Sequence, residues 1–246
     1  MIKVTRSIIP GLFTVGNLFL GFYSVICSFN GRINLACWFI IFAGLLDTAD
    51  GKIARLTRSA SRFGIEYDSL ADVVSFGLAP SVLMYSLLSG TSSFVIILLS
   101  FLPLLAGSIR LARFNIQLTG FDKEYFVGLP IPMAAITLVS FILFSLHFYQ
   151  VPARHPLVLS VLIIVVSLLM VSTIRYELLS TAISQNKVLQ IVQIVISLLL
   201  ILAIIIFPLV LLFPLMIVYI LSGIIRWIFQ QISSLNKGES VFESKH

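Results

Sequence analysis

The chain has 246 residues, of which 59% are hydrophobic and only 11% are charged, and its mean hydropathy is +1.10. Soluble domains carry about 25% charged residues, so this composition excludes a water-soluble globular protein and indicates an integral membrane protein. The net charge of +6 does not indicate a nucleic-acid partner, because the Lys and Arg residues lie between apolar runs and form no basic stripe with interleaved aromatic residues.

Apolar segments long enough to cross a bilayer follow one another along the chain. A transmembrane helix needs about 20 mostly apolar residues. The last two segments that qualify are separated only by a turn near Phe207 and Pro208, so seven spans are an alternative to eight. A polar tail at 230–246 is expected to be a short solvated extension, and no repeat or linker divides the chain, so we predict one all-α membrane domain over 1–246. The expected spans are roughly 8–29, 33–54, 68–89, 92–114, 130–149, 156–174, 188–207 and 209–229.

The basic residues are unevenly distributed between these spans. Fourteen of the 16 Lys and Arg residues fall on one side of the eight-span arrangement, and only Arg32 and Arg154 fall on the other. Cytoplasmic loops are enriched in Lys and Arg. We therefore expect a protein of the cytoplasmic membrane with both termini in the cytoplasm.

The chain has ten acidic residues, and four aspartates lie in a single window, 47–72. Asp47 and Asp50 are three residues apart near the end of the second expected span, and Asp68 and Asp72 are four residues apart at the start of the third. Both spacings place a pair of side chains on one face of a helix. The loop between the helices makes them antiparallel, so the two pairs can face each other.

Four carboxylates in so small a volume near the membrane interface would repel one another and would be costly to bury. Divalent cations solve both problems, and oxygen ligands suit Mg²⁺ and Mn²⁺. We therefore expect two such cations at Asp47, Asp50, Asp68 and Asp72. The site would open to the cytoplasm.

Small and basic residues accompany the acids. Gly51 would let a phosphate or nucleotide approach the backbone closely, and Ala54 continues the same open face. Arg55 could clamp a phosphate, and Gly64 would permit a tight entry into the third helix.

Two alternatives compete with this metal site. The acids could cap helix ends or pair with Lys52, Arg55, Arg58 and Arg62. The chain could also be a cation or proton transporter, since intramembrane acids attract ions. Transporters tend to place such acids at the midplane of repeated, broken helices, whereas these acids lie near one interface and have no second copy in the sequence.

The spacing Asp47-x2-Asp50-Gly51-x2-Ala54-Arg55-x8-Gly64-x3-Asp68-x3-Asp72 resembles the signature of the CDP-alcohol phosphatidyltransferase family at every fixed position. Pro10, Thr14 and Asn17 resemble its amino-terminal pattern. The stretches 68–80, 110–115 and 126–132 are similar to the phosphatidylserine synthase branch, so the likeness covers about 8–135.

This resemblance implies a helical bundle, usually a homodimer, that transfers a phosphatidyl group from CDP-diacylglycerol to L-serine and releases CMP. Asp47, Asp50 and Asp68 would ligate the metals, and Asp72 would bind metal and act as general base. The residues that it implies for binding the CDP-lipid are Gly51, Ala54, Arg55, Gly64, Thr14 and Asn17.

The acceptor would be held by basic residues. Arg110 and Arg113, three residues apart at the end of the fourth expected span, could bind the serine carboxylate through forked hydrogen bonds; Asn115 and Lys123 are further candidates. These arginines could instead anchor the helix at lipid head groups. Glycerol phosphate or inositol phosphate would also need basic residues, so a sister enzyme that uses one of them, choline or an archaeal ether lipid is an alternative.

Overall fold

The structure, a computed structural model, describes residues 2–57, 62–89, 94–117, 128–152, 154–174, 176, 202–203 and 206–243. Within these ranges, the side chains at 2–10, 54–57, 62, 117 and 232–243 lie outside the description. The described residues form helices and their connections and include no strand, which confirms the all-α class. The helices are α1 (Ile2–Phe29), α2 (Ile33–Thr57), α3 (Arg62–Asp72), the π-helical η1 (Val73–Leu78), α4 (Ala79–Leu88), α5 (Phe94–Gln117), α6 (Ile131–Tyr149), α7 (Pro156–Val171) and α9 (Pro208–Glu243).

Six helical stretches are apolar and long enough to cross a membrane, and α7, with 16 residues, is a shorter apolar helix. The expected span at 188–207 lies largely outside the described residues. The count of eight spans and the cytoplasmic position of the termini therefore stay predictions. The six stretches are Gly11–Phe29, Ile33–Ile53, Phe63–Leu88, Phe94–Ile116, Ile131–Tyr149 and Pro208–Gln231.

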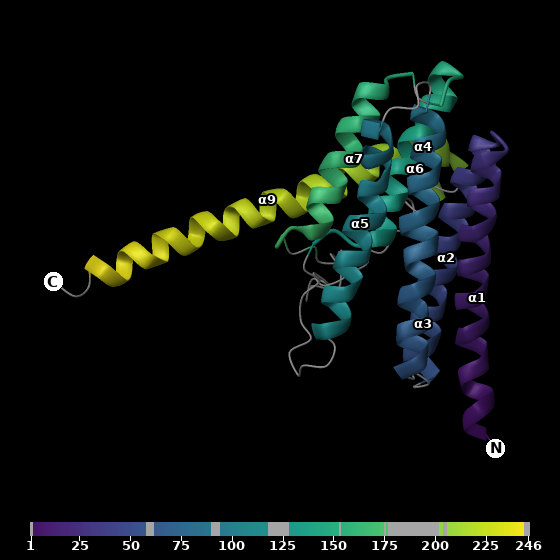
Figure 1. Ribbon diagram of the computed structural model, residues 1–246. Helices are drawn as coiled ribbons and strands as arrows, with labels where there is room; N and C mark the ends of the chain where they lie inside the picture. The colour runs from purple at the N-terminus through teal and green to yellow at the C-terminus, as the bar shows by residue number, and fades with distance from the viewer. Residues whose placement is uncertain are drawn as a thin grey trace.

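Helix α6 forms the centre of the bundle and packs against α2, α7 and α9. It is apolar on all sides, as expected for a helix surrounded by others, and Leu138, Val139 and Ile142 are fully buried. Helices α1 and α2 form an antiparallel hairpin beside the single column built by α3, η1 and α4 (Figure 1). This arrangement brings the end of α2 next to the start of α3.

Two helix boundaries differ from the expectation. The third helix begins at Arg62, before the start expected for the third span at residue 68, because the polar turns before Asp68 continue the helix although their hydropathy is too low to mark a span. The polar tail expected at 230–246 is helical as far as Glu243, since each residue added to an existing helix gains a hydrogen bond without a new nucleus. Figure 1 shows this carboxyl-terminal part of α9 leaving the bundle.

Candidate active site

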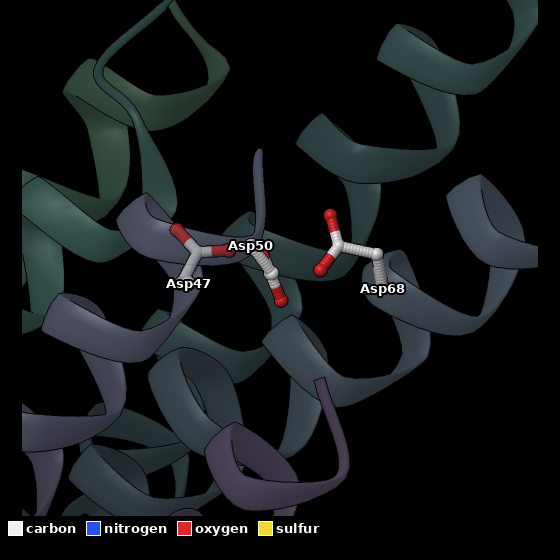
Figure 2. Close-up of side chains that lie close together, drawn as sticks. All are labelled: Asp47, Asp50 and Asp68. Atoms are coloured by element: carbon white, nitrogen blue, oxygen red, sulfur yellow. The ribbon is translucent and has the colours of Figure 1, made fainter. Parts of the chain in front are cut away.

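Three carboxylates converge where α2 ends and α3 begins. Asp47 and Asp50 lie on α2 and Asp68 lies on α3, and each offers a carboxylate oxygen within 4.8 Å of the others. Figure 2 shows the Asp68 carboxylate directed toward the other two. Asp50 is only 4% exposed, whereas Asp47 and Asp68 are half-buried. The structure thus brings the two predicted acid pairs together, as their spacing indicates.

Asp72 adjoins this group but has a different environment. It lies one turn further along α3 than Asp68, at the end of the helix, and it is buried. Its Oδ1 accepts a hydrogen bond from the Asn17 Nδ2 at 3.2 Å, and its carboxyl group lies close to that of Asp47. Asp72 is therefore held by a protein donor beside the three-carboxylate group.

Helix α1 supplies the donors that orient the acids. The Thr14 Oγ1 donates a hydrogen bond to the Asp50 Oδ2 at 3.0 Å, and Asn17, three residues later on the same helix face, donates to Asp72. Both side chains are buried. We expected these two residues to bind the CDP-lipid, and the structure places them directly against the carboxylates.

The close approach of α1 to η1 fixes these donors. A Cβ added at Gly21 would lie 2.6 Å from the Ser75 Cα, so only glycine fits between the two helices. The Ser75 Oγ in turn donates to the Asn17 carbonyl oxygen at 2.9 Å. Ser75 lies in η1, and short π-helical segments are frequent at functional sites. The wider turn that follows Asp72 thus packs against the residue that holds Asp72.

The expected phosphate-binding residues are only partly described. Gly51 is half-buried and directly follows Asp50 on α2. Gly64 is exposed and does not mark the entry into the third helix, because α3 already begins at Arg62. The side chains of Ala54 and Arg55 lie outside the described residues.

The four candidates for acceptor binding separate into different roles. Arg110 is buried at 7% exposure, and its charge interacts with Asp72. Arg113 is exposed and donates a hydrogen bond from NH1 to the Val171 carbonyl oxygen at 2.9 Å, so it ties α5 to the end of α7. The two arginines therefore do not act as one fork. Lys123 lies outside the described residues.

Asn115 links α5 to α3. Its Nδ2 donates to the Glu66 Oε2 at 3.1 Å, and its Oδ1 accepts from the Ser69 Oγ at 3.2 Å. Both ends of the Asn115 amide are thus used in holding α3, the helix that carries Asp68 and Asp72.

Two tyrosines on this side of the site, one next to Arg110 and the other next to the first, were not predicted from the sequence. Tyr219, on α9, is close enough to Arg110 for an electrostatic interaction, and its ring lies 5.7 Å from that of Tyr176, which follows α7. No spacing ties these tyrosines to the acidic signature. The one signal in the sequence is that Tyr219 places a hydroxyl within an apolar run.

The donor set fits a divalent cation. It consists of carboxylate oxygens, which hard cations such as Mg²⁺ and Mn²⁺ prefer. The Asp68 Oδ1 is buried and has no hydrogen-bond partner among the described residues, so its lone pairs are available to a ligand. The Asp cluster could therefore hold a metal ion.

The fold and the site define a class: an integral membrane protein with a carboxylate-rich site enclosed by its helices. A profile of the CDP-alcohol phosphatidyltransferase family matches residues 7–156. The chain belongs to this family, a family of enzymes that use divalent metals, as its acidic signature predicted. The family match argues for phosphatidyl transfer at the acidic site and against the transporter alternative.

Relatives in three organisms cover most of the chain. It is 37% identical over 232 residues to the CDP-diacylglycerol–serine O-phosphatidyltransferase of Helicobacter pylori, covering 94% of this chain and 96% of the relative. It is 41% identical over 177 residues to the archaetidylserine synthase of Methanothermobacter thermautotrophicus, covering 71% and 72%. It is 36% identical over 168 residues to the CDP-diacylglycerol–serine O-phosphatidyltransferase of Bacillus subtilis, covering 68% and 89%.

Proposed function

We propose that this enzyme transfers the phosphatidyl group of CDP-diacylglycerol to the hydroxyl of L-serine, giving phosphatidylserine and CMP. The observation that carries the chemistry is the convergence of the Asp47, Asp50 and Asp68 oxygens within 4.8 Å, with Asp72 beside them. Serine is supported by the three relatives above, whose names all specify it. Diacylglycerol is supported by the relative that matches 94% of the chain.

Two divalent cations, Mg²⁺ or Mn²⁺, would be held by Asp47, Asp50 and Asp68, with Asp72 as a further ligand. When bound, they would neutralise the pyrophosphate of the substrate and stabilise the charge on departing CMP. Thr14 supports this arrangement by fixing the Asp50 carboxylate through its hydrogen bond. Next to these cations, further residues would bind the nucleotide and the phosphates of the CDP-lipid. They are Gly51, Ala54, Arg55, Gly64, Thr14 and Asn17.

Asp72 acts as the general base. The serine hydroxyl oxygen attacks the phosphorus next to the glycerol oxygen, the bond from this phosphorus to the CMP oxygen breaks, and the hydroxyl proton passes to the Asp72 carboxylate. Burial and the hydrogen bond from Asn17 hold this carboxylate in one orientation. Arg110 would bind the serine carboxylate, since it is the buried member of the arginine pair.

The enzyme is proposed to lie in the cytoplasmic membrane with the acidic site open to the cytoplasm. The lipid substrate would stay in the bilayer while its head group enters from the side, and serine and CMP would exchange with water. The distribution of Lys and Arg between the spans supports this orientation. The homodimer implied by the family resemblance stays a prediction.

The deciding experiment is CMP release by the purified protein with CDP-diacylglycerol and Mn²⁺, comparing L-serine, glycerol 3-phosphate, inositol phosphate and choline as acceptors. We expect release with serine alone. Release with a different acceptor would assign the enzyme to a sister reaction. A parallel assay with the CDP-linked archaeal ether lipid determines which lipid is used.

A further inference from the structure

A buried polar cluster extends from Arg110 away from the acids. The charge of Arg110 interacts with Asp72 and with Tyr219 on α9, and the Tyr219 ring in turn lies 5.7 Å from the ring of Tyr176, which follows α7. Arg110 is 7% exposed and Tyr176 is 3% exposed. The cluster is therefore enclosed by the helices and continuous with the acidic site.

Two hydrogen-bond donors in this cluster have no acceptor in the part of the chain that the structure describes. The Arg110 Nε and the Tyr176 hydroxyl are both buried there without a hydrogen-bond partner. Burial raises the pKa of Tyr176 to about 12, so its hydroxyl keeps its proton at neutral pH and can donate. Unpaired buried donors are rare because they lose their bonds to water without replacement. Two of them in one buried cluster, each on a residue next to Tyr219, indicate a ligand group with acceptor oxygens.

The backbone holds Tyr176 in place. A Cβ added at Gly223 would lie 2.2 Å from the Tyr176 Cε1, so the ring packs directly against the α9 backbone. The segment before Tyr176 is fixed by hydrogen bonds from the Gly128 backbone N to the Ile174 carbonyl oxygen at 2.8 Å and from Arg113 to Val171. The hydroxyl is thus positioned before any ligand binds.

We infer that Arg110 and Tyr176, with Tyr219 beside them, bind the carboxylate of the amino-acid acceptor. This assignment rests on the proposed function and extends it. A carboxylate offers two acceptor oxygens to a guanidinium and a phenol, and charge-assisted hydrogen bonds of this kind are the strong ones. Tyr176 and Tyr219 lie beyond the family match at 7–156, so the carboxyl-terminal part of the chain completes the acceptor site.

The test compares variants of the purified full-length protein in the CMP-release assay. Tyr176→Phe removes only the hydroxyl, and we expect the KM for L-serine to rise about tenfold or more. The kcat and the KM for CDP-diacylglycerol should stay within about twofold. With L-serinamide, whose carboxylate is replaced by a neutral amide, wild type and variant should react equally. Gly223→Ala, which displaces the Tyr176 ring but keeps its hydroxyl, should raise the serine KM in the same way.

Tyr85→Phe is the matched control, because Tyr85 is an exposed tyrosine on α4, and it should leave every constant unchanged. If the wild type uses serine but Tyr176→Phe and Gly223→Ala keep its serine KM, the carboxylate assignment is wrong and the proposed function stands. An equal rise in the KM for CDP-diacylglycerol would likewise refute it. If the wild type does not use serine at all, the proposed function fails and this inference fails with it.

Discussion

Replacing Gly21 with alanine tests whether the packing of α1 against η1 sets the geometry of the acidic site. The added Cβ would lie 2.6 Å from the Ser75 Cα. Carbon atoms in good contact are about 3.5–4.0 Å apart, so the two helices would have to separate by about 1 Å. A side chain could rotate away, but the Ser75 backbone cannot.

The expected loss of activity follows from the hydrogen bond that this movement breaks. The Asn17 Nδ2 and the Asp72 Oδ1 are 3.2 Å apart, already at the long end of the hydrogen-bond range, and about 1 Å more separates them. A hydrogen bond to a charged group contributes about 1.5–3 kcal/mol. Since about 1.4 kcal/mol is tenfold in rate, kcat/KM should fall about 10- to 150-fold. Overpacking should also destabilise the protein by about 1–3 kcal/mol.

The assay combines CMP release with thermal unfolding of the purified protein in detergent. Gly11→Ala is the matched control, because it changes the same helix and its Cβ would have no atom within 4 Å. Alanine favours a helix over glycine by about 1 kcal/mol, so this control should keep its activity and its Tm or gain in Tm. Gly21→Ala with wild-type kcat/KM and Tm would refute the positioning role of this contact.

Three further predictions concern the acids and their cations. Asp72→Asn should lower kcat by about 10²–10⁴-fold while CDP-diacylglycerol still raises the Tm, and a kcat near wild type would exclude Asp72 as the base. Excess EDTA should abolish CMP release and Mg²⁺ or Mn²⁺ should restore it, whereas full activity in EDTA would contradict a metal-dependent site. Thr14→Val removes the donor to Asp50, so the metal concentration for half-maximal activity should rise about tenfold. Thr48→Val is its control, because the Thr48 hydroxyl donates a hydrogen bond within its own helix, to the Gly44 carbonyl oxygen, and an equal rise there would count against a specific role of Thr14.

The acidic site could be predicted because its geometry is local. Residues three or four apart lie on the same face of a helix, whatever the position of that helix in the fold. Asp47 and Asp50 therefore form one pair and Asp68 and Asp72 another. The two pairs come together if the two helices are antiparallel neighbours, and no other tertiary information is needed. The chemistry of clustered carboxylates then indicated cations. The structure adds that Asp72 is not one of the three acids whose oxygens converge, and that it is held beside them by Asn17.

The acceptor side could not be predicted in the same way. Arg110 and Arg113 have the spacing of a pair, but their environments depend on which neighbouring helices cover them, and one is buried while the other is bonded to Val171. Tyr219 comes next to Arg110, and Tyr176 next to Tyr219, only through tertiary packing, and the sequence around these tyrosines carries no periodic signal that would indicate it. The start of α3 at Arg62 was not predicted because hydropathy identifies apolar membrane-spanning residues, whereas the first turns of this helix are polar.

The π-helical segment η1 also lets one membrane-crossing column contain an extra residue without a change of direction. A π-helical turn closes through i→i+5 hydrogen bonds, so it contains about one residue more than the α-helical turn that it replaces. Deleting one residue from Val73–Leu78 and restoring regular α-helix would therefore keep α4 in nearly the same rotational setting relative to Asp68 and Asp72. Across sequences of this family, a one-residue gap in this span would mean the loss of the wide turn that packs against α1 and not a rotation of the acids.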